Sequence, residues 1–164
     1  GTYEQNYSFP NGCMICEVEV DPETGTIRVD RLAAVDDVGV VVNPLTLEGQ
    51  LHGSVAQGLG ETLVEQVLYD RDSGQLLTGS FLDYAMPRAD IMPYIVSEFA
   101  LVPTQSNLLG VKGGSEAGNC GMPAAIVNAV IDALAPWGIT DLPLPATPER
   151  VWRAIHQAAA ALSR

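Results

Sequence analysis

One glutamate late in the chain is surrounded by glycines, in the stretch Lys112-Gly113-Gly114-Ser115-Glu116-Ala117-Gly118. Glycines let backbone N–H groups approach a ligand closely, and loops of this kind bind anions. A carboxylate held in such a loop with little room for water would have a raised pKa and could act as a general base. The alternative is a solvated turn that happens to contain a glutamate. The stretch is not a phosphate-binding P-loop, because Lys112 precedes the glycines and no Gly-Lys-Ser/Thr is present.

A second Gly-rich stretch runs from residue 48 to residue 60 and contains two glutamines, Gln50 and Gln57. An amide side chain both donates and accepts hydrogen bonds, so the pair suits a heterocyclic ligand with alternating donors and acceptors. The alternative is a tightly packed helix whose polar residues face outward. Residue spacing alone favours this alternative.

The other reactive side chains form no convincing site in the sequence. Cys13 and Cys16 make a Cys-x-x-Cys pair, but no second pair of ligands follows at zinc spacing. Positions 13 and 16 of a strand also point to opposite faces, so we expect ordinary core cysteines and no protein-held metal. Asp36 and Asp37 would likewise face opposite ways, so we interpret them as a strand-end turn. Two histidines in the chain give little material for a Ser-His-Asp triad.

The first elements that must position these residues are a β-hairpin and a helix. Residues 13–20 and 26–36 are rich in β-formers and flank turn residues at 21–25, which predicts the hairpin. The stretch 47–66 is predicted to be helical, because apolar residues recur at a spacing of four. Those residues are Leu51, Val55, Leu59, Leu63 and Val67. Four glycines in this stretch each cost a helix about 1 kcal/mol relative to alanine, so we expect another segment to pack very close to its backbone.

The second half of the chain mixes short strands with helices. We expect a second hairpin formed by residues 64–69 and 75–81, followed by a strand at 94–102. A Gly-rich loop at 110–121 should then lead into a helix at 123–135 that begins at Pro123. Thr147-Pro148-Glu149 is a strong helix start, and the last helix should run to about Leu162. The order of elements predicts an α+β fold, with β-hairpins and a mixed sheet packed with a Gly-rich helix and two C-terminal helices.

Composition narrows the classes of function. The chain has 164 residues, 47% of them hydrophobic and 17% charged, which is enough to bury a core in one large domain or two small ones. A formal net charge of −12 makes nucleic-acid binding an unfavourable function. No stretch approaches the roughly 18 apolar residues of a membrane span, and no signal peptide is recognisable. Three cysteines, an odd number, favour a reducing compartment, so we expect a cytoplasmic location.

Five segments together resemble the molybdenum hydroxylase family, which includes xanthine dehydrogenases, aldehyde oxidases, aerobic carbon monoxide dehydrogenases and bacterial N-heterocycle hydroxylases. They stand in the family's order and cover nearly the whole chain. The segments are Glu17 to Gly25 with Val35 to Gly39; Asn43-Pro44 with Glu48 to Gly53 and Ala56 to Gly60; Asp83-Tyr84-Ala85-Met86-Pro87; Lys112 to Gly118; and Ala124 to Leu134 with Leu142-Pro143 and Thr147 to Trp152. Each segment alone is weak, but five in order are a strong match.

The resemblance implies a role for particular residues. Glu116 matches the family's active-site glutamate, which acts as general base in a hydroxylation that uses water as the oxygen source. Gly49 and Gln50 match the family's Gly-Gln pair near the molybdenum pterin cofactor. The loop residues Lys112, Gly113, Gly114 and Ser115 are expected to contact the same cofactor. The substrate would be an aldehyde, a purine, an N-heterocycle or carbon monoxide.

The resemblance also implies that further parts of the subunit and partner subunits exist, and it leaves two alternative functions open. Molybdenum subunits of the family are several times longer, so residues 1–164 would be the C-terminal portion of one, inactive without the rest. FAD and 2Fe-2S clusters would lie on a separate FAD subunit and iron–sulfur subunit. Ser115 departs from the glycine that many relatives have before the glutamate. The rival hypotheses are a non-catalytic assembly or binding module that packs on partner subunits, and an unrelated acidic binding domain.

Overall fold

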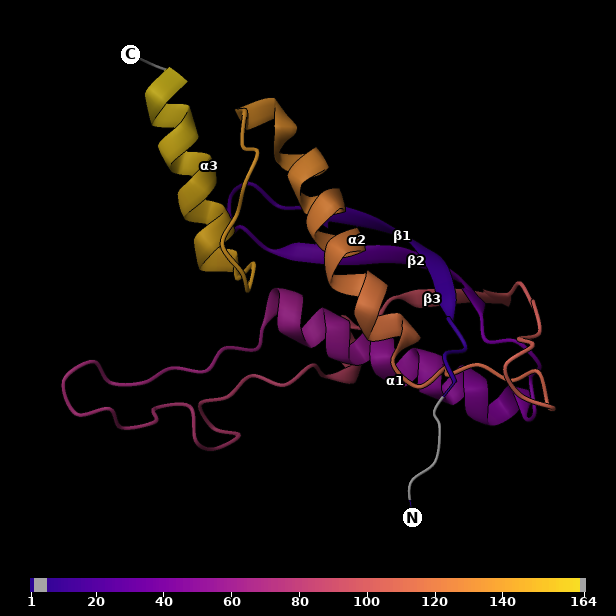
Figure 1. Cartoon of the computed structure of the whole chain (residues 1–164). Helices are drawn as coiled ribbons and strands as arrows, with labels where there is room; N and C mark the ends of the chain where they lie inside the picture. Colours follow the sequence, from indigo (N-terminus) through magenta and orange to yellow (C-terminus); the bar gives the residue numbers. More distant parts are fainter. Residues whose placement is uncertain (2–5, 163–164) are drawn as a thin grey trace.

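A long antiparallel hairpin forms the centre of the protein, whose computed structural model describes residues 1 and 6–162. β1 (Asn11–Val20) pairs with β2 (Ile27–Asp37), and the two strands run side by side behind the helices in Figure 1. The turn between them closes through hydrogen bonds from the Asp21 N–H to the Thr26 carbonyl (2.9 Å) and from the Gly25 N–H to the Asp21 carbonyl (2.7 Å). Gly25 has a φ of 73°, which favours glycine. The predicted hairpin is confirmed.

A third strand makes the sheet mixed. β3 (Tyr94–Phe99) pairs in parallel with β2, giving the order β1-β2-β3. One face of the sheet packs against the core through side chains such as Val18, Leu32 and Ile95. The other face leaves apolar side chains exposed to solvent, including Ile15 (68% exposed) and Tyr94 (76% exposed). The expected strand at 94–102 is therefore present but ends three residues early.

The predicted second hairpin is confirmed only next to its turn, where the Asp70 N–H donates to the Gln75 carbonyl (2.8 Å) and the Leu77 N–H donates to the Leu68 carbonyl (2.8 Å). Between α1 and β3 the chain forms one isolated bridge, Tyr69 to Leu76, around a turn in which Asp70 Oδ1 accepts from the Ser73 N–H (2.8 Å). This segment loops away from the helices and the sheet (Figure 1). The turn residues behave as the sequence predicts, but many of the flanking apolar side chains are largely exposed in the described structure, including Val67 (57%), Tyr69 (61%) and Phe81 (83%). A strand pair without a packed face is marginal in water.

The Gly-rich helix α1 (Pro44–Leu63) begins with Asn43 as its cap, whose side chain accepts from the Thr46 N–H (3.3 Å). Leu51, Val55, Leu59 and Leu63 are buried as the spacing predicts. The helix ends at Leu63 and not at residue 66, so Val67 lies beyond it and is 57% exposed. At Gly58 an added Cβ would lie 2.8 Å from Met122 Cβ, so the expected close approach occurs there. At Gly49 and Gly53 nothing lies within 4 Å, so the expectation fails at these two positions within the described residues.

The second helix begins earlier than predicted. α2 (Ala117–Leu134) contains Pro123 in its interior and starts six residues before it, so Pro123 is not the first helical residue. The reason lies in packing, because Gly118 and Gly121 let the first turn approach α1 and Met14 of β1. The 3-10 turns η1 (Ala89–Ile91) and η2 (Ala135–Trp137) precede β3 and follow α2. α3 (Pro148–Leu162) starts as predicted, with the Arg150 N–H donating to Thr147 Oγ1 (3.4 Å).

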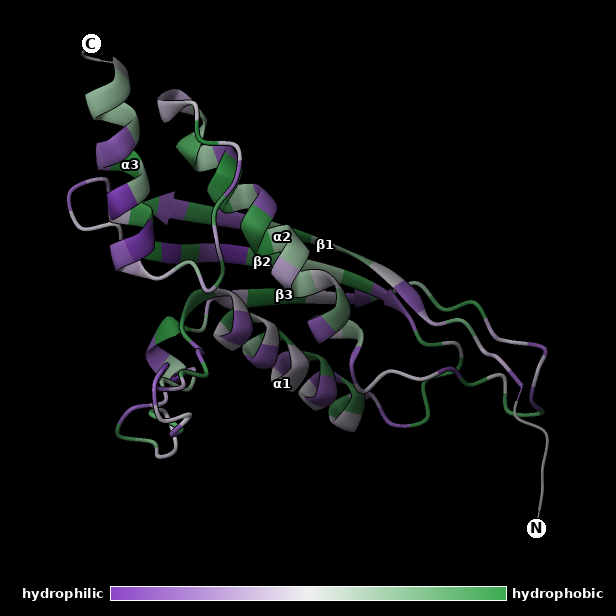
Figure 2. Ribbon diagram, turned by 60° about the vertical axis from the view of Figure 1, so that its left-hand side comes forward, coloured by the Kyte–Doolittle hydropathy of each residue, from purple (hydrophilic) through white to green (hydrophobic). Residues whose placement is uncertain are grey.

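The core lies between the sheet and the helices. α2 packs one apolar stripe against α1 and β1, and each side chain of the stripe is at most 1% exposed to solvent. The stripe consists of Met122, Ile126, Val130 and Leu134. Hydrophobic segments coincide with this interface in Figure 2.

Contrary to the expectation from sequence, the stretch Ala117–Trp137 is long and apolar enough to cross a membrane by length and composition. Its stripe packs as a core helix does. The predicted α+β class is confirmed.

Candidate active site

The loop that carries Glu116 is fastened to the end of β2 before it reaches the glutamate. The Lys112 N–H donates to the Val38 carbonyl (2.9 Å), and the Val40 N–H donates to the Gly110 carbonyl (3.0 Å). Asn107 holds the same segment from the other side, with its Oδ1 accepting from the Val111 N–H (3.2 Å) and its Nδ2 donating to the Val111 carbonyl (2.9 Å). Residues 110–112 therefore have a fixed position, from which 113–116 lead into α2.

Lys112 makes a buried ion pair with Asp37. Lys112 Nζ lies 2.5 Å from Asp37 Oδ2, and both side chains are only 8% exposed. Asp37 Oδ1 also accepts from the N–H groups of Gly39 (2.9 Å) and Val102 (3.0 Å). Lys112, together with these backbone donors, lowers the pKa of Asp37 to about 2. Because its ammonium group is bound to Asp37, Lys112 can reach a ligand only through its main chain.

Glu116 lies at the cap position of α2 and makes no capping hydrogen bond with its side chain. It lines a cavity of about 340 Å³ together with Gly113, Gly114 and Ser115. Its side chain is exposed in the described structure, so the water-poor environment that the sequence suggested is absent there.

Asp36 forms part of the opposite wall of this cavity. It is only 2% exposed, its Oδ2 has no hydrogen-bond partner among the described residues, and burial raises the pKa of its carboxyl. Gly12 lies so close that any Cβ there would collide with Asp36 Oδ1. The interpretation of Asp36 and Asp37 as a simple strand-end turn is therefore wrong. Both are buried, and only their position at the end of an apolar strand could have indicated it.

Gln50 faces a second hollow, of about 260 Å³, on the other side of the loop. Lys112, Gly114 and Ser115 also line it, so the structure brings these four predicted residues together. Gly114 lines both hollows, and a Cβ there would meet Leu47 Cδ1 at 2.9 Å. Gly113 lies with Glu116 instead, and Gly49 lines neither hollow.

The loop presents backbone donors without acceptors. Among the described residues, no carbonyl or side chain accepts from the N–H groups of residues 113–116. The first three N–H groups of α2 are equally free, because the earliest hydrogen bond there is from Cys120 to the Glu116 carbonyl (3.1 Å). Consecutive free N–H groups at a helix start favour an anionic ligand.

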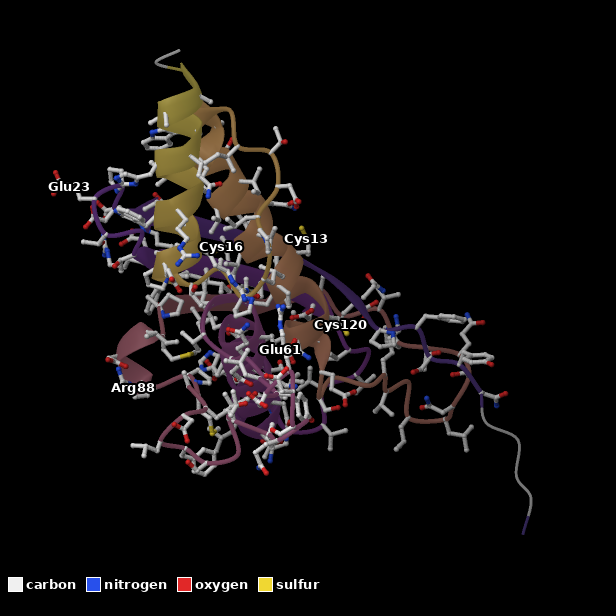
Figure 3. The ribbon with its side chains drawn as sticks, turned by 90° about the vertical axis from the view of Figure 1, so that its left-hand side faces the viewer. Cys13, Cys16, Glu23, Glu61, Arg88 and Cys120 are labelled. Carbon is white, nitrogen blue, oxygen red and sulfur yellow. The ribbon has the colours of Figure 1, made fainter. Side chains whose placement is uncertain are left out.

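The cysteines take no part in a metal site. Within residues 1 and 6–162, no group of three or more His, Cys, Asp or Glu side chains could hold a metal ion. Cys13 is exposed, which corrects the expectation of a core cysteine at that position, and Cys120 is exposed as well. Cys16 is half-buried, and burial raises its pKa to about 11. Figure 3 labels all three side chains.

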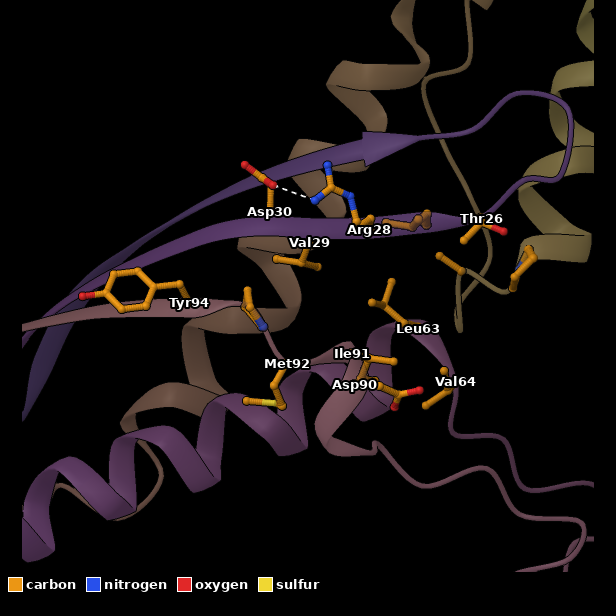
Figure 4. Close-up of a pocket in the computed structure, with 14 residues that line it drawn as sticks. Thr26, Arg28, Val29, Asp30, Leu63, Val64, Asp90, Ile91, Met92 and Tyr94 are labelled. Atoms are coloured by element: carbon orange, nitrogen blue, oxygen red, sulfur yellow. Dashed lines mark hydrogen bonds and ion pairs between the residues drawn. The ribbon is translucent and has the colours of Figure 1, made fainter.

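A larger hollow, of about 580 Å³, lies elsewhere, between the start of β2, the end of α1 and η1 (Figure 4). Val29, Leu63 and Met92 give it an apolar lining. None of the predicted site residues lines it.

Comparison with known proteins identifies relatives of this fold. The profile of the molybdopterin cofactor-binding domain matches residues 1–93. The chain is 46% identical to the nicotine 6-hydroxylase large subunit of Paenarthrobacter nicotinovorans over 146 residues, covering 89% of this chain and 18% of the relative. It is 34% identical to the carbon monoxide dehydrogenase large chain of Hydrogenophaga pseudoflava, covering 93% of this chain and 19% of the relative.

Solved structures agree with these relatives. Quinoline 2-oxidoreductase from Pseudomonas putida 86 matches with a TM-score of 0.81 and 41% identity, covering 85% of this chain and 18% of that one. The Cu,Mo-CO dehydrogenase in its carbon monoxide reduced state matches with a TM-score of 0.87 and 29% identity, covering 92% and 19%. The chain thus spans about a fifth of the length of the relatives it matches. It belongs to the family of molybdopterin cofactor-binding domains and corresponds to part of the large subunit of molybdenum hydroxylases.

Proposed function

We propose that this chain is the C-terminal portion of the molybdenum subunit of a hydroxylase, and that Glu116 is the general base of its reaction. The reaction would oxidise an aldehyde, a purine, an N-heterocycle or carbon monoxide with water as the oxygen source. The observation that carries the proposal is the position of Glu116, an unrestrained carboxylate at the start of α2 beside a cavity and a loop of free N–H groups.

The residues present fit a molybdenum pterin cofactor. The candidate donors are backbone N–H groups of the loop, the Gln50 amide and the Ser115 hydroxyl. Such donors suit a polar organic anion better than a bare divalent ion, which needs carboxylate, imidazole or thiolate ligands. We assign cofactor contact to Gly49, Gln50, Gly113, Gly114 and Ser115, and to the main chain of Lys112. When bound, the cofactor supplies the two-electron redox chemistry, and the protein supplies orientation and electrostatics.

Glu116 would take the proton from the water-derived nucleophile as it attacks the substrate carbon. A general base contributes about 10²–10⁴-fold to the rate. A carboxylate suits this role when no other hydrogen bond holds it, and Glu116 makes no cap hydrogen bond. The adjacent free N–H groups at the start of α2 supply positive potential near the developing charge.

The proposal includes partners that the chain needs for activity. These are the remainder of the molybdenum subunit, an iron–sulfur subunit with 2Fe-2S clusters and an FAD subunit, in the cytoplasm. Among the relatives, the nicotine 6-hydroxylase chain is named a large subunit and a 6-hydroxypseudooxynicotine dehydrogenase chain is named a complex subunit gamma, which supports an assembly of several subunits. Exposed apolar side chains such as Phe81, Leu82 and Leu108 offer surface for such contacts. The chain alone would be inactive.

The same exposed apolar surface favours the second candidate, a non-catalytic assembly module that packs on partner subunits. The two functions differ in what Glu116→Gln does in the assembled complex. We expect turnover to fall by about 10²–10⁴-fold, with molybdenum content close to that of the wild type. The probe substrate is the best of nicotine, quinoline, hypoxanthine and carbon monoxide, chosen on the wild-type complex.

A matched control is Glu23→Gln, in the turn between β1 and β2 and well apart from Cys120 at the start of α2 (Figure 3). It removes a carboxylate from an exposed position and should leave turnover unchanged. Activity of Glu116→Gln within about tenfold of wild type would reject Glu116 as the base. A native complex without molybdenum would favour the assembly module.

A further inference from the structure

Asp37 accepts hydrogen bonds from four residues, three of which are distant from it in the sequence. Its two oxygens accept hydrogen bonds from Asn11 Nδ2 at the start of β1 (3.4 Å), the Gly39 N–H after β2 (2.9 Å), the Val102 N–H after β3 (3.0 Å) and Lys112 Nζ (2.5 Å). One buried carboxylate therefore joins the ends of all three strands to the loop before Glu116.

The contact with Lys112 is the one that reaches the loop. Lys112 is followed directly by Gly113 and Gly114, and glycines impose few conformational limits of their own. The residues around Lys112 fix only the near end of the loop, through the Lys112 N–H and its bond to the Val38 carbonyl (2.9 Å). The bond from Lys112 Nζ to Asp37 is a further contact that holds the residue directly before the loop.

We propose that Asp37 is a positioning residue for Glu116, acting through Lys112 and residues 113–115. This inference rests on the proposed function, in which Glu116 is the general base. It also changes the role of Lys112, whose ammonium group orients the loop instead of binding the cofactor. Asp36, the next residue, faces the cavity of Glu116 and does not bond to Lys112, so the two adjacent carboxylates have separate roles.

The test compares Asp37→Asn with wild type in the assembled complex, with kcat expressed per bound molybdenum. Asparagine is nearly isosteric, but it carries no charge to hold Lys112. We expect kcat per molybdenum to fall about 10–100-fold, because displacing a catalytic group by about 1 Å costs on the order of 10²-fold. KM should change little, and Asp37→Glu, which restores the charge, should recover part of the rate.

Asp30→Asn is the matched control. It removes a carboxylate from the same strand, where Asp30 pairs with Arg28 (2.9 Å) on the surface, and should leave kcat per molybdenum unchanged. A purely structural role for Asp37 would lower molybdenum content but leave kcat per molybdenum unchanged. That result overturns the proposal.

Lys112→Met keeps the test decisive if Asp37→Asn does not assemble. It removes the same contact from the other end and leaves Asp37 its three remaining donors. Loss of kcat per molybdenum in this variant supports the proposal, and an unchanged value overturns it. If Glu116→Gln is inactive while both variants are normal, the proposed function stands and only the positioning role fails. If Glu116→Gln is active, the function itself fails.

Discussion

Gly118 offers a way to move Glu116 without changing any reactive group. A Cβ at Gly118 would lie 2.8 Å from the Val55 nitrogen and 3.0 Å from the Leu51 oxygen, both main-chain atoms of α1. The main chain of a packed helix cannot rotate aside as a side chain can. In Gly118→Ala the start of α2 must therefore move by about 0.6 Å, the difference between 2.8 Å and the 3.4 Å at which ordinary contact begins.

This displacement is large enough to affect catalysis. Catalytic groups have to be held within about 0.5 Å of productive geometry, and about 1 Å of misplacement costs on the order of 10²-fold. Since Glu116 lies two residues before Gly118, we expect kcat per bound molybdenum to fall about tenfold. Overpacking costs about 1–3 kcal/mol of stability, and the better helix propensity of alanine offsets up to about 1 kcal/mol of it.

The assay is steady-state turnover of the assembled complex together with its thermal unfolding. Ala124→Ser, on the exposed side of the same helix, is the control and should leave both measurements close to wild type. A lowered Tm with an unchanged kcat would refute the reasoning, because it would show that the start of α2 can move without disturbing the chemistry. Unchanged Tm and kcat would mean that α1 yields more easily than its packing indicates.

The remaining predictions concern the core and the two adjacent aspartates. Met122→Ala should destabilise the protein by about 2–5 kcal/mol, measured by denaturant unfolding, because Met122 is fully buried against Gly58. Because the pKa of Asp37 is lowered to about 2, its stabilising effect is complete above the ordinary value near 3.8 and is lost as pH falls toward 2. The backbone N–H groups of residues 110–112 should therefore keep the same protection against hydrogen exchange from pH 7 to about pH 5 and lose it below about pH 4. Protection that persists at low pH would contradict this. Asp36 has a raised pKa, so its ionisation opposes folding, and Asp36→Asn should gain stability relative to wild type as pH rises through the carboxyl range. An equal effect at low and neutral pH would show that burial of Asp36 is not the cause.

Local patterns in the sequence were sufficient for some elements and failed for others, according to what stabilises each element. The β1–β2 turn and the start of α3 depend on nearby residues, such as Gly25 and Thr147, and both were predicted correctly. The hairpin at 64–81 and the start of α2 depend on distant contacts. The first leaves many of its apolar side chains exposed, and the second begins early because Gly118 contacts α1. Spacing within a segment carries no information on either.

The candidate site divides in the same way. Glu116, Gln50 and the loop residues carry motifs that resemble a family, and the structure places most of them around two adjoining hollows. Asp36 and Asp37 lie in one of the matching segments, but the resemblance gave them no role. The importance of Asp36 lies in its burial, and that of Asp37 in contacts to residues 65 and 75 positions away. Buried carboxylates with specific partners can be recognised only once the strands and the loop are assembled in space.

The described residues explain one glycine of α1 by close packing and leave two others without a packing neighbour. Gly58 has a clear reason in the described residues, since Met122 occupies the space that a side chain would need. Gly49 and Gly53, one turn apart beside Gln50, face open space, yet each costs an exposed helix about 1 kcal/mol relative to alanine. On the proposed function, the group that approaches them is the cofactor or the remaining four fifths of the subunit. A bare helix surface beside Gln50 is what a large ligand or a neighbouring backbone would require.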